Sequence, residues 1–478
     1  MLKESRYNVW SEVGDRHFVF NGRSGVLVQM TAGQRSALDA VLVGATELSE
    51  DIAELLQALV QTSVLVSETT DELELLERDY TASRDLESVN LTVVTSMGCN
   101  FDCPYCFESK YPALLEDRVA DAIVALVALR LPAPVVDITW FGGEPLVGRR
   151  QLLSLAARLQ ELCAANGTRF QGSIITNGWY LDGATAAALA AHGVESAQVT
   201  LDGPREINDR SRPHKNRRLS TYDRIVDNLT EAVEHLRIDV RVNLARDNAA
   251  HLDQLLADLE SRGLRDRLTV SPARIRAAGE QTQVTNHDQF FTTAAFAEYE
   301  SAVSPLLEQH GFGGQGLPTP IGAPCTAVRK NELVIGPAGE LWKCWEEVAD
   351  RRAQLGSIFD IAHLGDVDTR GWLDETPFID PQCRDCTALP VCMGGCPKMA
   401  RNGNRDGQCG TFRHNHQRRI DAVAQALCGV DAPDHAQALS EIAGILGQPT
   451  APAPGSPVPV VLGPRRRLEF VPATAPAG

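Results

Sequence analysis

The sequence predicts an α/β protein whose centre is a parallel β-sheet covered by helices. From residue 89 onward, short apolar runs typical of buried strands alternate with amphipathic helical patterns, and six such strand–helix units follow one another. Turns that contain glycine, asparagine or cysteine come directly after several of these runs, where parallel sheets place their chemistry. Segments of different composition flank this region, so we expect more than one domain in 478 residues.

Composition restricts the class of function. Acidic residues outnumber basic residues by 62 to 45, which gives a formal net charge of −17 and disfavours binding to nucleic acid or anionic membranes. The first residues lack the apolar core of a secretory signal, and no run of about 18 apolar residues predicts a membrane span. We therefore expect a cytoplasmic protein that binds neither nucleic acid nor membrane.

Residues 1–68 are expected to form a small separate module. Its strands come first, then two helices and a closing strand, which is a winged-helix-like order. The helices are acidic or neutral, so DNA, the usual ligand of such a fold, is disfavoured. The strands are predicted at residues 8–10, 17–20, 26–30 and 63–66.

Capping residues define the two helices of this module. Thr31 and Gln34 have the spacing of a capping box, which predicts a helix through Leu42. Ser49 is expected to cap the second helix, which has acidic residues in its first turn. An acidic segment with helical periodicity follows at residues 69–88, and we interpret it as a helical linker.

Residues 89–310 contain the six strand–helix units. Each apolar run has the length of a strand, and each helical pattern has one apolar face. Strands are predicted at residues 91–95, 135–141, 170–176, 197–201, 238–245 and 268–271. Helices are predicted at residues 119–129, 152–165, 184–192, 222–236 and 252–262, with a further helix at 289–309.

Twelve cysteines indicate metal binding or catalysis, because disulfides are rare in the cytosol. Ten fall into three spaced groups, whereas Cys163 and Cys428 stand alone, and Cys163 is expected to be a small buried apolar residue. The first group is Cys99, Cys103 and Cys106, after the first strand of the central region. Three thiolates leave one iron of a four-iron cluster free to bind a reactive molecule. A zinc site or a disulfide staple is the alternative, although zinc prefers four ligands in paired Cys-x2-Cys units.

The spacing Cys-x3-Cys-x2-Cys, with Tyr105 before the last cysteine, resembles the cluster loop of the radical SAM superfamily. The resemblance implies an open partial TIM barrel of six βα units, which matches the number of predicted strands. It also implies a [4Fe-4S] cluster on the three cysteines and S-adenosyl-L-methionine (SAM) as cofactor. Gly142, Gly143 and Glu144 match the family's GGEP motif, which holds the methionyl amino group of SAM.

Further SAM contacts are implied at the ends of later strands, where related enzymes place hydroxyl, arginine and asparagine residues. Asn177 is equally well explained as a turn residue, and the same holds for Asp202. The matching positions are Asn177, Thr200, Arg212 and Asn243.

A second field of cysteines occupies residues 321–430. Cys325 is followed by Gly339 and Cys344, then by the spacing Cys-x2-Cys-x5-Cys-x3-Cys and one last cysteine. This spacing resembles the SPASM domain, which implies two auxiliary [4Fe-4S] clusters. By family topology, the cluster farther from the barrel binds Cys383, Cys386, Cys392 and Cys409. The nearer cluster, whose open iron takes a non-cysteine residue or a substrate thiol, binds Cys325, Cys344 and Cys396.

Local patterns assign the remaining C-terminal segments. A glycine-containing turn between two apolar runs predicts a hairpin with strands at residues 332–335 and 340–343. Helical periodicity recurs at residues 413–427 and 435–446. Residues 449–478 are rich in proline and alanine and are expected to be disordered.

The family resemblance implies an oxidoreductase that reductively cleaves SAM and abstracts hydrogen from a ribosomally made, post-translationally modified peptide (RiPP). We expect it to install a thioether or carbon–carbon crosslink in the precursor peptide. The N-terminal module resembles the RiPP recognition element, to which a leader peptide adds a strand. An electron donor such as flavodoxin or ferredoxin is also implied. Asp202 and Glu346 are the candidates for a general base.

Three alternatives remain from the sequence. One is oxidation of a protein residue, as in sulfatase maturation, but that branch has an aspartate directly after the cysteine of the G-x4-C motif, where this chain has Trp345. Another is radical chemistry on a small molecule, with residues 1–68 as a packing element. The third is a zinc-bound scaffold without catalytic activity, which metal analysis would separate from an iron–sulfur enzyme.

Overall fold

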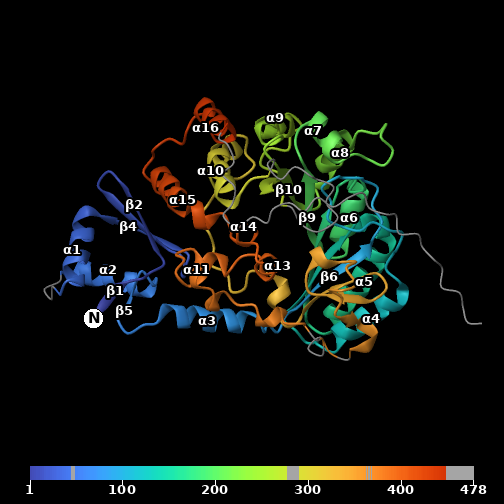
Figure 1. The fold of residues 1–478 in the computed structure, drawn as a ribbon, viewed down its shortest axis with the longest axis horizontal. Helices are drawn as coiled ribbons and strands as arrows, with labels where there is room; N and C mark the ends of the chain where they lie inside the picture. The colour runs from blue at the N-terminus through green and yellow to red at the C-terminus, as the bar shows by residue number, and fades with distance from the viewer. Residues whose placement is uncertain (45–48, 277–289, 362, 364–366, 368, 448–478) are drawn as a thin grey trace, which may run out of the picture. The chain divides into compact units, whose positions relative to one another are not determined.

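A nine-stranded sheet forms the centre of the molecule, and six of its strands are parallel and adjacent in chain order (Figure 1). The computed structural model describes residues 1–44, 49–276, 290–361, 363, 367 and 369–447. All six predicted strands are confirmed, and most extend beyond the predicted bounds. The strands are β6 Val89–Ser96, β7 Val135–Gly142, β8 Arg169–Thr176, β9 Val194–Leu201, β10 Arg237–Leu244 and β11 Thr269–Arg274.

Helices connect these strands and cover the sheet. The five predicted connecting helices are confirmed, and their apolar faces join the strands in the largest core cluster. They are α4 Asp117–Ala128, α5 Arg149–Ala165, α6 Gly183–Ala191, α8 Thr221–Ala232 and α9 Leu252–Ser261, with the short α7 Arg205–Ser211 before α8.

The next helix, α10 Thr293–Gln309, begins later than predicted. The side chain of Thr292 accepts a hydrogen bond from the backbone nitrogen of Ala295, so Thr292 is the N-cap. The predicted start at Gln289 lies outside the described residues.

The predicted C-terminal hairpin is confirmed, and it extends the central sheet. Its strands are β12 Glu332–Ile335 and β13 Glu340–Trp342, followed by β14 Gly356–Ser357. Strand β12 pairs in parallel with β6, where Asn90 Nδ2 donates to Glu332 Oε1 at 2.7 Å. The cysteine-rich segment therefore covers the sheet edge beside the strand that leads into the first cysteine group.

The N-terminal module contains a three-stranded antiparallel sheet followed by two helices. Its three predicted strands are confirmed as β2 Asn8–Val13, β3 Arg16–Asn21 and β4 Val26–Thr31. The closing strand β5 Leu65–Ser67 pairs with β1 Leu2–Glu4, a strand that the sequence did not predict.

Helices α1 Ala32–Leu42 and α2 Glu50–Gln61 begin where the capping residues predict. The capping box of Thr31 and Gln34 is confirmed, because both reciprocal hydrogen bonds are made. Ser49 occupies the N-cap of α2, but its side chain makes no capping hydrogen bond. The acidic first turn of α2 stabilises that helix end instead.

Helix α3 Glu72–Ser83 lies in the predicted linker and has a buried face. Leu76 and Tyr80 pack in one core cluster with Tyr7 of the module and Phe378 of the cysteine-rich segment. Tyr80 also donates a hydrogen bond to the carbonyl oxygen of Glu375 at 2.9 Å. Met1–Gln448 form one compact unit, and α3 contributes to its core.

Short helices carry most of the second cysteine field. They are α11 Pro381–Arg384, α12 Leu389–Cys392, α13 Pro397–Arg401 and α14 Arg405–Gln408. The predicted helices after them are confirmed as α15 Phe412–Leu427 and α16 His435–Gly447. The tail predicted to be disordered lies outside the described residues.

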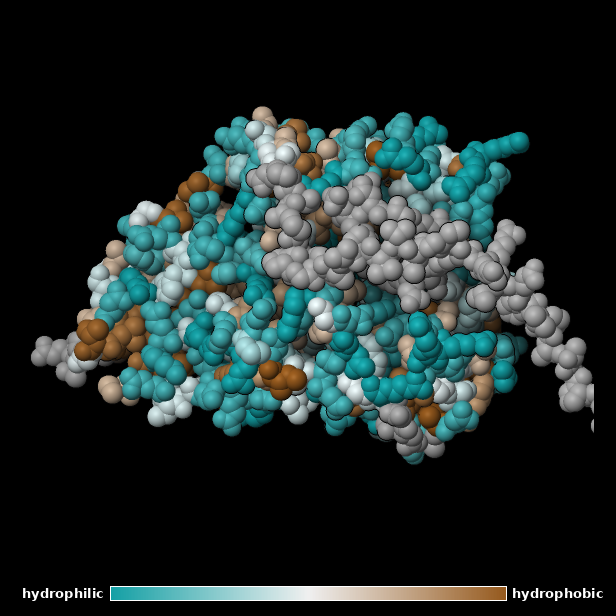
Figure 2. Space-filling model, viewed as in Figure 1, coloured by the Kyte–Doolittle hydropathy of each residue, from teal (hydrophilic) through white to brown (hydrophobic). Residues whose placement is uncertain are grey.

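Hydrophilic residues dominate the face in Figure 2, and the hydrophobic residues on it form small separate groups. None of the helices in the described ranges combines the length and apolar character needed to cross a membrane.

The carboxylate of Asp406 ties α14 to the end of β11. Its Oδ2 accepts a hydrogen bond from Arg274 at 2.7 Å, and its Oδ1 accepts one from the backbone nitrogen of Thr293 at 2.7 Å. Burial opposes the charge of Asp406, but these partners lower the pKa of its carboxyl below the ordinary value. The contribution to stability is therefore present at neutral pH and is lost only as pH falls below about 4, through the lowered pKa.

Asp406→Asn is expected to destabilise the protein by about 2 kcal/mol at pH 7, because it weakens charge-assisted bonds to a nearly buried arginine. Thermal unfolding of the cluster-loaded protein measures this loss. Asp385→Asn is the matched control, because the Asp385 side chain is 87% exposed. Equal melting temperatures for the two variants would contradict the prediction.

Candidate functional site

A cavity of about 300 Å³ lies at the carboxyl ends of the parallel strands. One wall is the loop after β6, and the opposite wall includes residues of β9, β10 and β11. The structure brings together ten predicted site residues here: Cys99, Cys103, Cys106, Gly142, Gly143, Asn177, Thr200, Arg212, Asn243 and Glu346.

The cysteine loop is fixed by the segment that follows α7. Asp102 donates its backbone N–H to the carbonyl oxygen of Pro213 at 2.9 Å, and Lys215 donates to the carbonyl oxygen of Asn100 at 2.9 Å. Phe101 is fully buried and meets the His214 ring edge-on at 6.1 Å. The segment after α7 therefore holds the loop through backbone hydrogen bonds and a ring contact.

The donor set of this loop fits an iron–sulfur cluster. Burial raises the pKa of the Cys99 thiol to about 12, and it also raises the pKa values of Cys103 and Cys106. Such thiols become thiolates when metal cations bind them. Asn177 Nδ2 lies 3.8 Å from Cys99 Sγ and donates to it, the kind of hydrogen bond that tunes cluster sulfur.

Two glycines allow the end of β7 to approach the segment before the cysteine loop. Gly142 has φ +144°, and a Cβ there would lie 2.2 Å from the carbonyl oxygen of Ser96. A Cβ on Gly143 would lie 2.9 Å from the carbonyl oxygens of Met97 and Gly98. Only glycine fits this approach, which places the backbone of both residues along the cavity.

Glu144 is buried and its carboxylate faces the protein, outside the set of cavity-lining residues. It accepts hydrogen bonds from Thr176 Oγ1 at 2.7 Å, the Asn177 backbone nitrogen at 2.7 Å and the Leu146 backbone nitrogen at 3.0 Å. The carboxylate thus connects the ends of β7 and β8. The cavity is bordered instead by the two preceding glycines.

Arg212 and Tyr105 form a polar group beside the cluster loop. Arg212 Nη1 donates to the Tyr105 hydroxyl at 2.5 Å, and Asn243 Nδ2 donates to the same oxygen at 3.4 Å. Burial opposes the guanidinium charge, yet Tyr105, Cys103 and Asp202 raise the pKa of Arg212 above its ordinary value. A cation fixed at this wall suits a carboxylate ligand.

Asp202 does not line the cavity. Its Oδ2 accepts a hydrogen bond from Ser211 at 2.8 Å, and its backbone carbonyl accepts one from Asn248 Nδ2 at 2.8 Å. Burial raises the pKa of its carboxyl. These bonds connect the end of β9 with α7 and with the segment after β10. This structural role is close to the interpretation of Asp202 as a turn residue.

Several lining residues were not singled out from the sequence. Arg241 lies two residues before Asn243 on β10, and the same spacing separates Arg274, the last residue of β11, from Arg276 just beyond it. Side chains two apart share one face of a strand, and that alternation is the signal that could have found them. The structure therefore adds a basic wall to the cavity.

Trp345 and Glu346 bring the cysteine-rich segment to the cavity. The Trp345 ring stacks on Phe141, with ring centres 5.8 Å apart and planes at 22°. Glu346 forms ion pairs of 3.7 Å with Arg276 and with Lys398. A larger cavity of about 820 Å³ shares Ile175, Gln198 and Trp345 with this one and extends along β9 and β10 to the amino ends of β10 and β11.

The other seven cysteines gather in two places. Cys325 packs with Cys344 and Trp372. Burial raises the pKa of the Cys325 thiol most, and the nearby thiol of Cys396 raises it further. Burial raises the pKa of Cys383 to about 11, and neighbouring thiols raise it as well. Those neighbours are Cys386, Cys392 and Cys409.

The cysteine triad at the strand ends and the glycine pair beside it define the class of protein. Residues 93–259 match the model of the Radical SAM superfamily. The chain therefore carries a radical SAM domain and is an enzyme that performs radical chemistry of the oxidoreductase type. This class uses a [4Fe-4S] cluster and SAM, and the cavity residues described above fit both groups.

Known relatives share most of this chain. The serine-type anaerobic sulfatase-maturating enzyme of Klebsiella aerogenes is 23% identical over 331 residues, which cover 66% of this chain and 80% of that protein. The structure of native anSMEcpe with bound AdoMet has a TM-score of 0.53 at 16% identity and covers 70% of this chain and 100% of that chain. The structure of native anSMEcpe with bound AdoMet and the Kp18Cys peptide has a TM-score of 0.54 at 16% identity. The match covers 70% of this chain and 99% of that chain. At this identity, the structures show a shared fold.

Proposed function

We propose that this enzyme modifies a ribosomally made precursor peptide by installing a thioether or carbon–carbon crosslink. One observation carries the proposal. The cavity with the cysteine triad adjoins the larger cavity of about 820 Å³ through Ile175, Gln198 and Trp345. That volume is at the upper end of small-molecule sites, and it suits a few residues of a peptide held beside the cofactor.

Residues of this chain would hold the cofactors. Cys99, Cys103 and Cys106 would bind the [4Fe-4S] cluster, and the backbone of Gly142 and Gly143 would accept hydrogen bonds from the methionyl ammonium of SAM. When bound, the cluster supplies the electron that cleaves SAM into methionine and a 5′-deoxyadenosyl radical, which removes hydrogen from the substrate. The remaining polar contacts to SAM would come from Asn177, Thr200, Arg212 and Asn243.

Other residues would control the substrate side of the cavity. The stacked rings of Phe141 and Trp345 give one wall of the cavity an apolar surface that would shield a bound radical from water. Glu346 lines the cavity and Asp202 does not, so Glu346 is the better candidate for a base. Formation of a crosslink removes two hydrogen atoms from the peptide. The radical abstracts the first, and the second leaves as a proton and a separate electron. The proton would go to the base.

An auxiliary iron–sulfur cluster bound by the remaining cysteines would accept that electron. We assign one auxiliary [4Fe-4S] cluster to Cys325, Cys344 and Cys396. A flavodoxin or ferredoxin would supply the electron for SAM cleavage. The second auxiliary cluster is assigned to Cys383, Cys386, Cys392 and Cys409.

The N-terminal module would bind the precursor peptide at the outer edge of β4, as a winged-helix-like recognition element. In the described part of the chain, β4 pairs with β3 and with no other strand. The opposite edge strand β2 is occupied, because Gln417 of α15 donates a hydrogen bond to the Trp10 carbonyl at 2.7 Å. An extended peptide can add to an unpaired strand edge through backbone hydrogen bonds.

Precursor peptide is expected to slow backbone hydrogen exchange along Val26–Thr31, because a new strand would occupy the outward amides of β4. Exchange followed by mass spectrometry of the cluster-loaded enzyme measures this effect. Strand β2 is the internal control, since its edge is already covered by α15. Unchanged exchange along β4 at saturating peptide would contradict this binding site.

A second candidate function is oxidation of a serine or cysteine residue in a protein. The similarity to the Klebsiella aerogenes sulfatase-maturating enzyme favours it. Trp345 disfavours it, because the residue at this position is an aromatic side chain stacked on Phe141 and has no carboxylate to act as a base. Both candidates require a peptide segment in the larger cavity.

Anaerobic turnover with candidate precursor peptides tests the proposal and separates the candidates. The crosslink is expected to remove two hydrogen atoms, to block fragmentation between the joined residues and to leave the product inert to hydrazide reagents. A product that reacts with a hydrazide carries an aldehyde and supports residue oxidation. Formation of 5′-deoxyadenosine without any change in the peptide would overturn both.

A further inference from the structure

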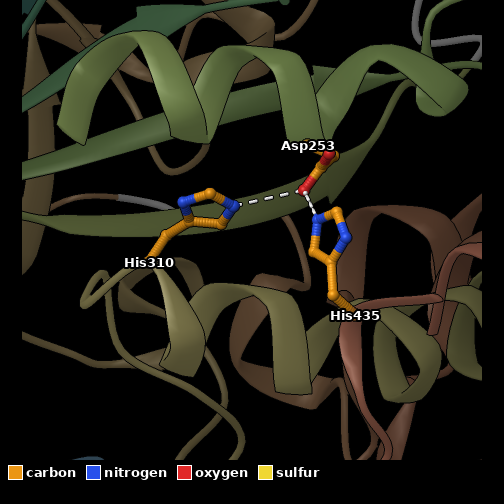
Figure 3. A group of neighbouring side chains, drawn as sticks. All are labelled: Asp253, His310 and His435. Atoms are coloured by element: carbon orange, nitrogen blue, oxygen red, sulfur yellow. Dashed lines mark hydrogen bonds and ion pairs between the residues drawn. The ribbon is translucent and has the colours of Figure 1, made fainter. Parts of the chain in front are cut away.

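Three side chains from separate helices meet on the surface away from the cysteine cavity. Asp253 lies in the first turn of α9, His310 follows the end of α10, and His435 begins α16. One ligand atom of each lies within 4.8 Å of the other two. Figure 3 shows both imidazole rings turned toward the same carboxylate.

The hydrogen bonds of this group converge on one oxygen. Asp253 Oδ1 is 3.2 Å from His310 Nε2 and 2.8 Å from His435 Nε2 (Figure 3). When both Nε2 atoms are unprotonated, the three atoms become two nitrogen ligands and one oxygen ligand around a common point. A divalent ion bound at that point would take the place of the two protons that the hydrogen bonds otherwise share.

A second carboxylate orients one of the rings. Glu260 Oε2 lies 2.7 Å from His310 Nδ1, on the side of the ring opposite Asp253. A histidine that binds a metal through one nitrogen usually donates its other N–H to a carboxylate, which fixes the tautomer. This contact would keep the proton on Nδ1 of His310, so that a metal ion displacing the Nε2 proton binds the Nε2 lone pair.

We propose that Asp253, His310 and His435 bind a divalent transition metal, with zinc as the ion whose chemistry fits best. Two imidazoles and one carboxylate with an open fourth position for water make a known zinc ligand set. None of the three residues lines the cavity of the cysteine triad, so the site is separate from the proposed chemistry. His435 has a side chain 50% exposed, which gives the ion access from solvent.

The metal would hold the start of α16 against α9 and the end of α10. Ala438, Ile442 and Ile445 of α16 already pack in the main core cluster. Gln309 donates a hydrogen bond to the Pro433 carbonyl at 3.1 Å, which holds the segment just before His435. A metal bound by residues 182 positions apart in the chain would add a cross-link at the helix end and stabilise this docking.

Zinc binding by the enzyme with its iron–sulfur clusters filled tests the proposal, because filled clusters occupy the cysteines. Equilibrium dialysis against buffered zinc, followed by mass spectrometry of both metals, is expected to find about one zinc per chain. His435→Gln keeps a side-chain N–H that can reach Asp253 but removes the nitrogen ligand. It is expected to lose at least about 90% of the zinc with unchanged iron. Glu260→Gln is expected to weaken zinc binding about tenfold.

His235→Gln is the matched control, because His235 is an exposed histidine outside this group. It is expected to bind zinc like the wild type, and zinc should raise the melting temperature of both proteins. The same addition should leave the melting temperature of His435→Gln unchanged. Absence of zinc from the wild type, or wild-type zinc content in His435→Gln, would overturn the proposal.

Discussion

Replacing Cys99, Cys103 and Cys106 together by alanine is expected to abolish formation of 5′-deoxyadenosine from SAM, a loss of at least about a thousandfold. The three thiols line one cavity with Gly142 and Gly143, and no other group of cysteines does so in the described ranges. With the two auxiliary clusters proposed above on the other seven cysteines, iron content should fall from about twelve to about eight atoms per chain. Chromatography of the nucleoside and iron analysis on the same sample measure both quantities.

Cys428→Ala is the control for this triple variant. Cys428 is the C-cap of α15, is partly buried and belongs to none of the three cysteine groups. It should keep both the iron content and the rate of SAM cleavage. If the triple variant still produced 5′-deoxyadenosine at the wild-type rate, the assignment of the radical SAM cluster to this loop would be wrong.

The strands were predictable from the sequence because local patterns determine them. Residues of β6 are buried along nearly their whole length, so a continuous apolar run is sufficient to identify that strand. The pairing of β12 with β6 was not predictable, since Asn90 and Glu332 are 242 positions apart and neither strand carries a local sign of its partner. Contacts between distant segments follow from the completed fold.

The candidate site likewise has residues that local sequence predicts and residues whose positions depend on distant segments. The cysteine spacing was enough to identify Cys99, Cys103 and Cys106 as cavity residues, because three ligands that lie in one short loop need no contact with distant segments to come together. The direction of the Glu144 carboxylate depends on donors from Thr176 and Asn177 of the neighbouring strand, which the motif does not contain. Likewise, Trp345 reaches the cavity only because β12 and β13 extend the central sheet.

Gly142→Ala is expected to destabilise the cluster-loaded protein by about 4 kcal/mol, which lowers the melting temperature of a unit of this size by about 4 °C. The new Cβ would lie 2.2 Å from the Ser96 carbonyl oxygen, and φ +144° is a conformation reserved for glycine. Neither β6 nor β7 can move away without breaking the pairing of Ser96 with Gly142 that positions the cysteine loop. SAM binding, measured by calorimetry below the melting temperature, should therefore weaken as well.

Gly167→Ala separates the effect of close approach from the effect of backbone conformation. Gly167 also has a positive φ, +65°, but a Cβ there would meet no atom within 4 Å. Its substitution should cost only about 1 kcal/mol, or about 1 °C, through the left-handed conformation alone. Equal losses for the two variants would mean that the overlap with Ser96 is relieved at no cost, and that Gly142 is not what holds the cysteine loop against the end of β7.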